Sequence, residues 1–198
     1  MISTVLAINL QTAFQQEMAT NFFTLKRLGS GNIRLFSFRF ANGKPFESFR
    51  HYSEPQQLSA ELAQGKKFID FPGTFSPIPL VVSCRVHELL SGFAVHPSIQ
   101  WHQVRIDSNI LDQDKSQFWA CSIVVEALPS VLNQEFADRN PREYIFGDNP
   151  AVVEDIDLLI DESMHELFSL RLRDALLELE LPHVSFDLVG ERQCDTST

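Results

Sequence analysis

The sequence predicts an α+β fold in a single domain, with mixed, mostly antiparallel strands and a few helices. Segments with strand-like alternation outnumber those with helical spacing, and the two kinds follow one another without a regular βαβ order. The chain has 198 residues, 44% of them hydrophobic, which is enough for a buried core. The sequence shows no internal repeat. We expect the domain over residues 1–190 and a polar tail at 191–198, and we leave open a division into two lobes.

The first part of the domain, about residues 1–68, is expected to contain a β-hairpin. Residues 21–28 fit a strand or a short helix, and the aromatic run 33–40 fits a strand. Asn42-Gly43 is the residue pair best suited to a tight hairpin turn. Residues 45–49 are therefore expected to return as the partner strand.

Two helices are expected in the middle of the chain. Residues 54–67 predict a short polar helix, because Leu58 and Leu62 would share one of its faces. Ser83 is a suitable N-cap for a second helix that runs through Leu90.

Two strands should follow, at residues 99–106 and 118–127. In the first, His102, Val104 and Ile106 alternate with more polar residues. A short strand is expected at residues 144–146, within a stretch that otherwise reads as loop.

The last long element is expected to be a helix with a broad leucine face. Its N-cap is either Ser163, which forms a capping box with Glu166, or Ser169. Pro182 ends this helix, and residues 184–188 then alternate as a closing strand.

The net charge of −10 is distributed unevenly. Residues 1–134 hold 11 Lys and Arg against 10 Asp and Glu, whereas residues 135–198 hold 5 Arg against 16 Asp and Glu. Such an acidic third disfavours nucleic-acid binding and favours a basic partner, unless it serves only solubility. Residues 1–10 lack the basic start and cleavage site of a signal peptide, and no membrane-length apolar run follows, so we expect a cytoplasmic protein without a membrane partner.

We find no constellation of residues that predicts catalysis, a metal site or a cofactor. Three cysteines are too few for a disulfide framework or a zinc site, and there is no Gly-x-Ser-x-Gly elbow or phosphate-binding glycine loop. His96 and His102 could share a strand face, but Pro97 interrupts it. Cys84 would start a helix, and Cys121 reads as a core residue.

One stretch combines five carboxylates with apolar residues. Glu154, Asp155, Asp157, Asp161 and Glu162 interleave with Val, Ile and Leu, which predicts an apolar side that packs and an acidic side that faces solvent. This acidic side is either a solvated face or part of a partner-binding surface.

Residues 70–188 resemble immunity protein family eleven, a group of bacterial polymorphic-toxin immunity proteins. The resemblance rests on Asp70-Phe71-Pro72, on residues 79–90 (PLVVSCRVHELL), on the two strands that follow, and on residues 166–176 (ELFSLRLRDAL) with Val184-Ser185-Phe186. It implies a protein that binds and neutralises a cognate toxin or secreted effector in competition between bacteria, and it implies no catalytic residues.

The sequence thus predicts a non-catalytic immunity protein that blocks the active site of its toxin. A nuclease toxin with a basic cleft would suit the five carboxylates, whereas other toxins would be blocked by apolar anchors such as Trp101 or exposed Phe. Two other function classes stay open. One is a small hydrolase-like enzyme that uses Cys84 or His102, and the other is a regulatory adaptor.

Overall fold

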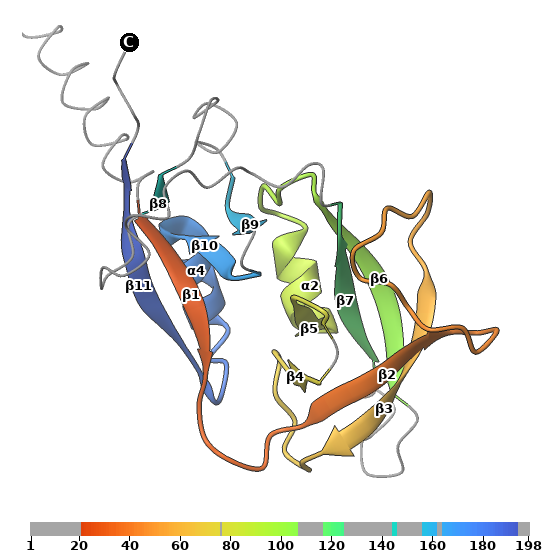
Figure 1. Ribbon diagram of the computed structural model, residues 1–198. Coiled ribbons are helices and arrows are strands. Elements are labelled where there is room, and N and C mark those ends of the chain that lie inside the picture. The colour runs from red at the N-terminus through yellow and green to blue at the C-terminus, as the bar shows by residue number, and fades with distance from the viewer. Residues whose placement is uncertain are drawn as a thin grey trace, which may run out of the picture.

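Two β-sheets face each other across two helices (Figure 1). The computed structural model describes residues 21–75, 77–106, 117–124, 144–145, 156–161 and 164–193. The helices are α2 (Cys84–Leu90) and α4 (Leu170–Glu178). The predicted α+β class with mostly antiparallel strands is confirmed.

The first sheet has five strands in the order β8-β11-β1-β10-β9. All neighbours are antiparallel except β8 and β11. Its strands are β1 (Asn21–Arg27), β8 (Tyr144–Ile145), β9 (Leu158–Ile160), β10 (Glu166–Ser169) and β11 (Val184–Gln193).

The second sheet has six strands in the order β4-β2-β3-β6-β7-β5. The pairs β2–β4 and β3–β6 are parallel, and the other pairs are antiparallel. Its strands are β2 (Arg34–Phe40), β3 (Gln57–Gln64), β4 (Gly73–Thr74), β5 (Val81–Ser83), β6 (Ile99–Ile106) and β7 (Gln117–Ile123).

The same strand–helix–strand unit occurs once in each sheet, a structural similarity that the absence of a repeat in the sequence did not reveal. In the second sheet, β5 leads through α2 to β6, and the antiparallel strand β7 lies between them. In the first sheet, β10 leads through α4 to β11, and the antiparallel strand β1 lies between them. The repeat is hard to see in the sequence because few residues repeat beyond those at the start of each helix.

A buried carboxylate holds the start of the helix in each unit. In the first, Asp70 accepts hydrogen bonds from the Ser83 hydroxyl (2.6 Å) and from Arg85 Nε (2.6 Å), and its carbonyl accepts the Ser83 N–H (2.8 Å). Ser83 is the N-cap, since its hydroxyl accepts the N–H of Val86.

Asp157 makes the same contacts in the second unit. It accepts the Ser169 hydroxyl (2.7 Å) and Arg171 Nε (3.1 Å), and its carbonyl accepts the Ser169 N–H (2.8 Å). Asp70 and Asp157 are 0% and 3% exposed, so both carboxylates depend on these donors for the hydrogen bonds that water would otherwise supply. The common pattern is an Asp followed, twelve or thirteen positions later, by Ser-x-Arg.

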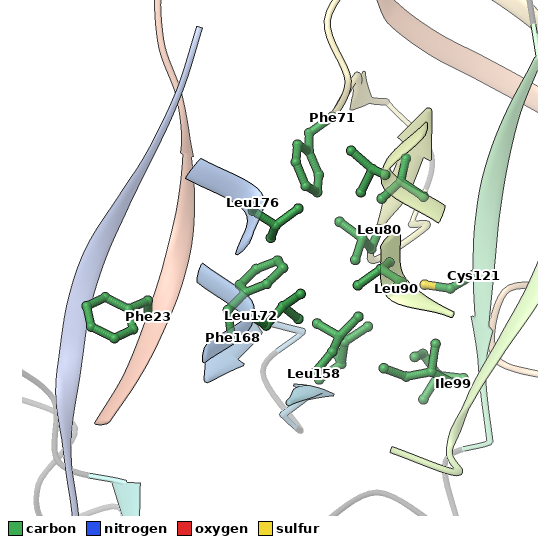
Figure 2. Close-up of a cluster of buried hydrophobic side chains, with 14 residues drawn as sticks. Phe23, Phe71, Leu80, Leu90, Ile99, Cys121, Leu158, Phe168, Leu172 and Leu176 are labelled. Carbon is green, nitrogen blue, oxygen red and sulfur yellow. The ribbon is translucent and has the colours of Figure 1, made fainter. Parts of the chain in front are cut away.

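One hydrophobic core joins the two sheets. Figure 2 shows Leu172 and Leu176 of α4 on one side and Leu80, Leu90 and Cys121 on the other. These side chains belong to a single buried cluster that also draws residues from β5, β7, β9 and β10. A second cluster lies within the six-stranded sheet and covers its opposite face. The division into two lobes stays a prediction.

Residues 54–67 form no helix, contrary to prediction, because β3 occupies Gln57–Gln64. Leu58 and Ala60 point into the second core cluster, with Leu62 packed beside them. A spacing of four between Leu58 and Leu62 fits either a helix face or one side of a strand. Because β3 pairs with β2 and β6, these residues form a strand and not a helix.

The hairpin prediction is only partly confirmed. A turn follows β2, and Gly43 has a φ of +79°, but residues 45–49 return only as a single bridge between Arg39 and Pro45. The long antiparallel partner of β2 is β3.

The last helix begins at one of its two predicted N-caps, and the strand that follows it is longer than predicted. Of the two possible N-caps for the last helix, Ser169 is the one found, and Glu166 lies in β10 instead. The closing strand extends beyond the predicted residues 184–188 to Gln193, so it includes the first three residues of the predicted polar tail, and residues 194–198 lie outside the described residues.

We predict that Asp157→Asn and Asp70→Asn each lower the free energy of unfolding by about 2 kcal/mol, because several donors lose a charged acceptor. Burial raises the pKa of Asp157, but hydrogen bonds from Arg171, Ser169 and the Ala94 amide outweigh this and place the pKa below its ordinary value. The Asp157 contribution is therefore present above the pKa of an unfolded Asp, about 3.9, and is lost as the pH falls through the folded-state pKa.

Urea unfolding at pH 7 and at pH 3 measures both effects. Asp187→Asn is the control, because Asp187 pairs with Lys26 and both side chains are about 60% exposed. Equal losses in Asp157→Asn and Asp187→Asn would contradict the prediction.

Candidate protein-binding groove

A groove of about 670 Å³ opens beside β2, and we call it the Phe groove. Phenylalanines from three separate segments of the chain dominate its lining. The lining residues are Phe36, Ser37, Phe38, Arg39, Pro45, Phe46, Glu47, Ser48, Phe49, Phe75, Pro77 and Ile78.

A β-bulge in β2 shapes one wall of the groove. The register with β3 shifts between Phe36 and Arg39, and Ser37 adopts a φ of +53°. The extra residue places Leu35 and Phe38, three positions apart, in the same core cluster. Phe36 and Ser37 are left only half-buried along the groove.

Ser48 connects the two loops that carry Phe49 and Phe75. Its hydroxyl donates to the carbonyl of Pro77 (2.6 Å), and its own carbonyl accepts the N–H of Ile123 (2.6 Å). The N–H of Phe75 donates to the carbonyl of Leu35 (3.0 Å). The loops that carry Phe49 and Phe75 are thus bonded to each other. The first loop is also bonded to β7, and the second to β2.

Aromatic packing supports Phe46, one of the residues that line the groove. Phe46 stacks on Tyr52 with ring centroids 5.5 Å apart, and both rings meet His102 edge-on at 5.0 Å. The Tyr52 hydroxyl accepts the N–H of Glu47 and donates to its carbonyl, which fixes the loop that carries Phe46 and Phe49. Rings packed in this way lose little further freedom when a ligand binds.

Two large aromatic side chains are exposed at the rim. Phe49 is 44% exposed and Phe75 is 58% exposed. The guanidinium of Arg34 lies over the Phe75 ring, 5.4 Å from its centroid. Exposed aromatic rings gathered around a groove are typical of interaction sites, whereas isolated exposed apolar residues are common on any surface.

The predicted acidic surface is not assembled as expected. Asp157 and Asp161 are buried, at 3% and 4% exposure. Asp157 holds Ser169 and Arg171, and Asp161 accepts the backbone N–H of His165 (2.8 Å) and contacts its ring. The prediction that these two side chains face solvent is therefore wrong, because the fold uses them internally. Glu154, Asp155 and Glu162 lie outside the described residues.

Trp101, predicted as an apolar anchor, is only half-buried and packs beside α2. The His87 ring meets Trp101 edge-on at 5.6 Å and stacks flat on Trp119 at 3.8 Å. Its packing role is clear, and its role as an anchor stays a prediction.

The residues proposed for catalysis are engaged in the fold. His102 is 0% exposed; its Nδ1 accepts the N–H of Gln56 (3.0 Å), so its Nε2–H donates to the Ser122 hydroxyl (2.8 Å). Cys84 does begin α2, as predicted, but burial raises the pKa of its thiol. Burial also raises the pKa of the Cys121 thiol to about 12, which fits the core role predicted for it.

His96 does not join His102 in a metal site. It is buried and its Nδ1 lies 2.8 Å from the Ser98 hydroxyl. Within the described ranges, no three His, Cys, Asp or Glu side chains are placed to bind a metal ion.

Neither a family model nor a curated protein matches this chain. In the part of the chain that the structure describes, neither helix has the length and apolar content needed to span a membrane.

One feature of the sequence points to the Phe groove, namely a local concentration of phenylalanine. Five of the 17 Phe occur between positions 36 and 49, and two of them lie beyond the turn at Asn42-Gly43. The contribution of Phe75 depends on β4 pairing with β2, which no local pattern reveals.

We predict that His102 makes the protein less stable as the pH falls from 6.5 to 4. Burial lowers the pKa of His102 to about 4, whereas an unfolded His has a pKa of about 6.5. Between these values the unfolded chain binds the proton and the folded chain does not, which corresponds to a loss on the order of 3 kcal/mol.

His102→Gln keeps an acceptor and a donor but does not titrate, so the stability difference between wild type and variant should shrink toward low pH. Urea unfolding across this range measures the difference. His87 and His96, whose pKa values burial also lowers, are present in both proteins and cancel. A difference that does not change with pH would contradict the prediction.

Proposed function

We propose that this chain is a non-catalytic immunity protein that binds a cognate bacterial toxin or effector in the cytoplasm and blocks its active site. The observation that carries the proposal is the Phe groove, with Phe49 and Phe75 exposed over a preformed hollow of about 670 Å³. The nature of the partner rests on the resemblance of residues 70–188 to immunity protein family eleven.

The Phe groove has the physical properties of a binding hot spot. A few aromatic residues in a well-packed pocket usually supply most of the energy of a protein interface. Here the loops are held by Ser48 and Tyr52 before any partner arrives, so binding need not order them. A partner side chain that enters the groove would contact rings that are already in place.

The rival functions fit the described residues less well. A hydrolase-like enzyme that uses His102 would need a ring nitrogen free to accept a proton, but both nitrogens are hydrogen-bonded and buried. An enzyme that uses Cys84 would need a thiol with a lowered pKa, and burial raises it. A regulatory adaptor could use the same groove, so rescue from a toxin separates it from an immunity protein.

The direct test is co-purification of this chain with the product of the adjacent gene, followed by calorimetric titration and a growth assay. We expect a tight complex and rescue of cells that produce the adjacent gene product. A complex without toxicity to relieve would favour the adaptor. No complex would contradict the proposal.

Phe49→Ala and Phe75→Ala should each weaken this complex by about 2 kcal/mol, or roughly 30-fold in Kd, while stability changes little. Leu177→Ala and Leu188→Ala are matched controls, because these side chains are 52% and 50% exposed on other elements. A triple Ser variant of Glu154, Asp155 and Glu162 tests the acidic alternative. Loss of binding in that variant alone would place the interface away from the Phe groove.

A further inference from the structure

We infer that the Phe groove receives an acidic segment of the partner protein, with an apolar side chain packed between Phe49 and Phe75 and carboxylates on the neighbouring arginines. This inference rests on the proposed function and adds the chemistry of the partner surface. It is opposite in sign to the basic partner that the overall charge of the chain suggests.

Two cations beside the groove, Arg34 and Arg39, have no acidic partner among the residues that the structure describes. Arg39 lines the groove and donates to the carbonyl of Gly43 (3.2 Å), and Arg34 lies over the Phe75 ring. Arg34 and Arg39 are both exposed. Among the described residues, no carboxylate lies within ion-pair distance of either guanidinium. Each guanidinium therefore has N–H donors free for a carboxylate.

The one carboxylate in the lining is already paired. Glu47 lies 3.5 Å from Arg50, so these two charges offset each other at the rim. The balance of charge at the groove is therefore set by Arg34 and Arg39 and is positive.

The segment that carries most of the groove lining also has a positive net charge. Residues 21–75 hold eight Lys and Arg against four Asp and Glu, and one of the four, Asp70, is buried against Arg85. Residues 164–193, which form most of the opposite sheet, hold six Asp and Glu against three Arg. Among the described residues, the acidic excess of residues 164–193 thus lies mainly in the other sheet, and the segment that carries most of the groove lining attracts an acidic partner segment.

The arrangement of Arg34 and Phe75 suits a partner segment that carries both an apolar and an acidic side chain. The ring supports the guanidinium from one face and still presents exposed apolar surface to a ligand. Arginine binds a carboxylate through two parallel hydrogen bonds, which fixes orientation as well as adding attraction. An apolar anchor in the groove and an adjacent Asp or Glu would use both features at once.

The test compares association kinetics of the purified adjacent gene product with charge variants of this chain. Arg34→Gln combined with Arg39→Gln should slow association by roughly 3- to 10-fold at low salt and flatten its salt dependence. Lys66→Gln combined with Lys67→Gln removes the same charge from exposed positions outside the Phe groove and should have a smaller effect.

A cross-linking experiment identifies the partner segment. With Phe75 replaced by the photo-crosslinker p-benzoylphenylalanine, the captured peptide should carry a net negative charge and at least one large apolar residue. A basic captured peptide, or faster association of the double arginine variant, would overturn the inference while leaving the proposed function intact. Failure of the adjacent gene product to bind wild-type protein would instead remove the proposed function, and this inference with it.

Discussion

Two buried carboxylates, Asp70 and Asp157, anchor the chain at the two points where a strand leads directly into a helix. Each accepts a hydrogen bond from the serine that caps the helix, and each holds the arginine two residues further on. A buried carboxylate without donors would be strongly disfavoured, so the capping serine, the arginine and the preceding segment must assemble together. These contacts anchor the first residues of α2 and α4, and the buried side chains of both helices pack in one shared core.

The candidate site lies outside this repeated framework. The unit built from β5, α2, β6 and β7 is extended by β3, β2 and β4, and the Phe groove is built on that extension and the loops beside it. The other unit carries β8 and β9 at its edges instead. The repeated part thus supplies a rigid support, and the part that breaks the symmetry supplies an exposed, preorganised aromatic surface. Binding sites are often placed in this way, on loops held by a scaffold.

Local patterns predicted the elements whose signals are contained within a few residues. The Ser83 cap with its helix and the alternation of Ile99–Ile106 were both correct, because a cap and a half-buried strand are read from neighbouring residues. The prediction failed at Leu58 and Leu62, where a spacing of four suits two structures and the sheet partner decides. It also failed at Asp157 and Asp161, because a carboxylate looks solvated in sequence unless its distant arginine or backbone donors are known.

By itself the sequence determined the α+β class, the Cys121 core position and the supply of phenylalanine between positions 36 and 49, since composition and short-range periodicity carry this information. Tertiary structure alone decided which acids are buried, which Phe side chains stay exposed, and that Arg34 stands beside Phe75. The physical reason is that burial and pairing depend on contacts between segments tens of residues apart. Ser48 and Pro77, which are in contact, lie 29 residues apart in the sequence, and Asp157 and Ala94 lie 63 residues apart.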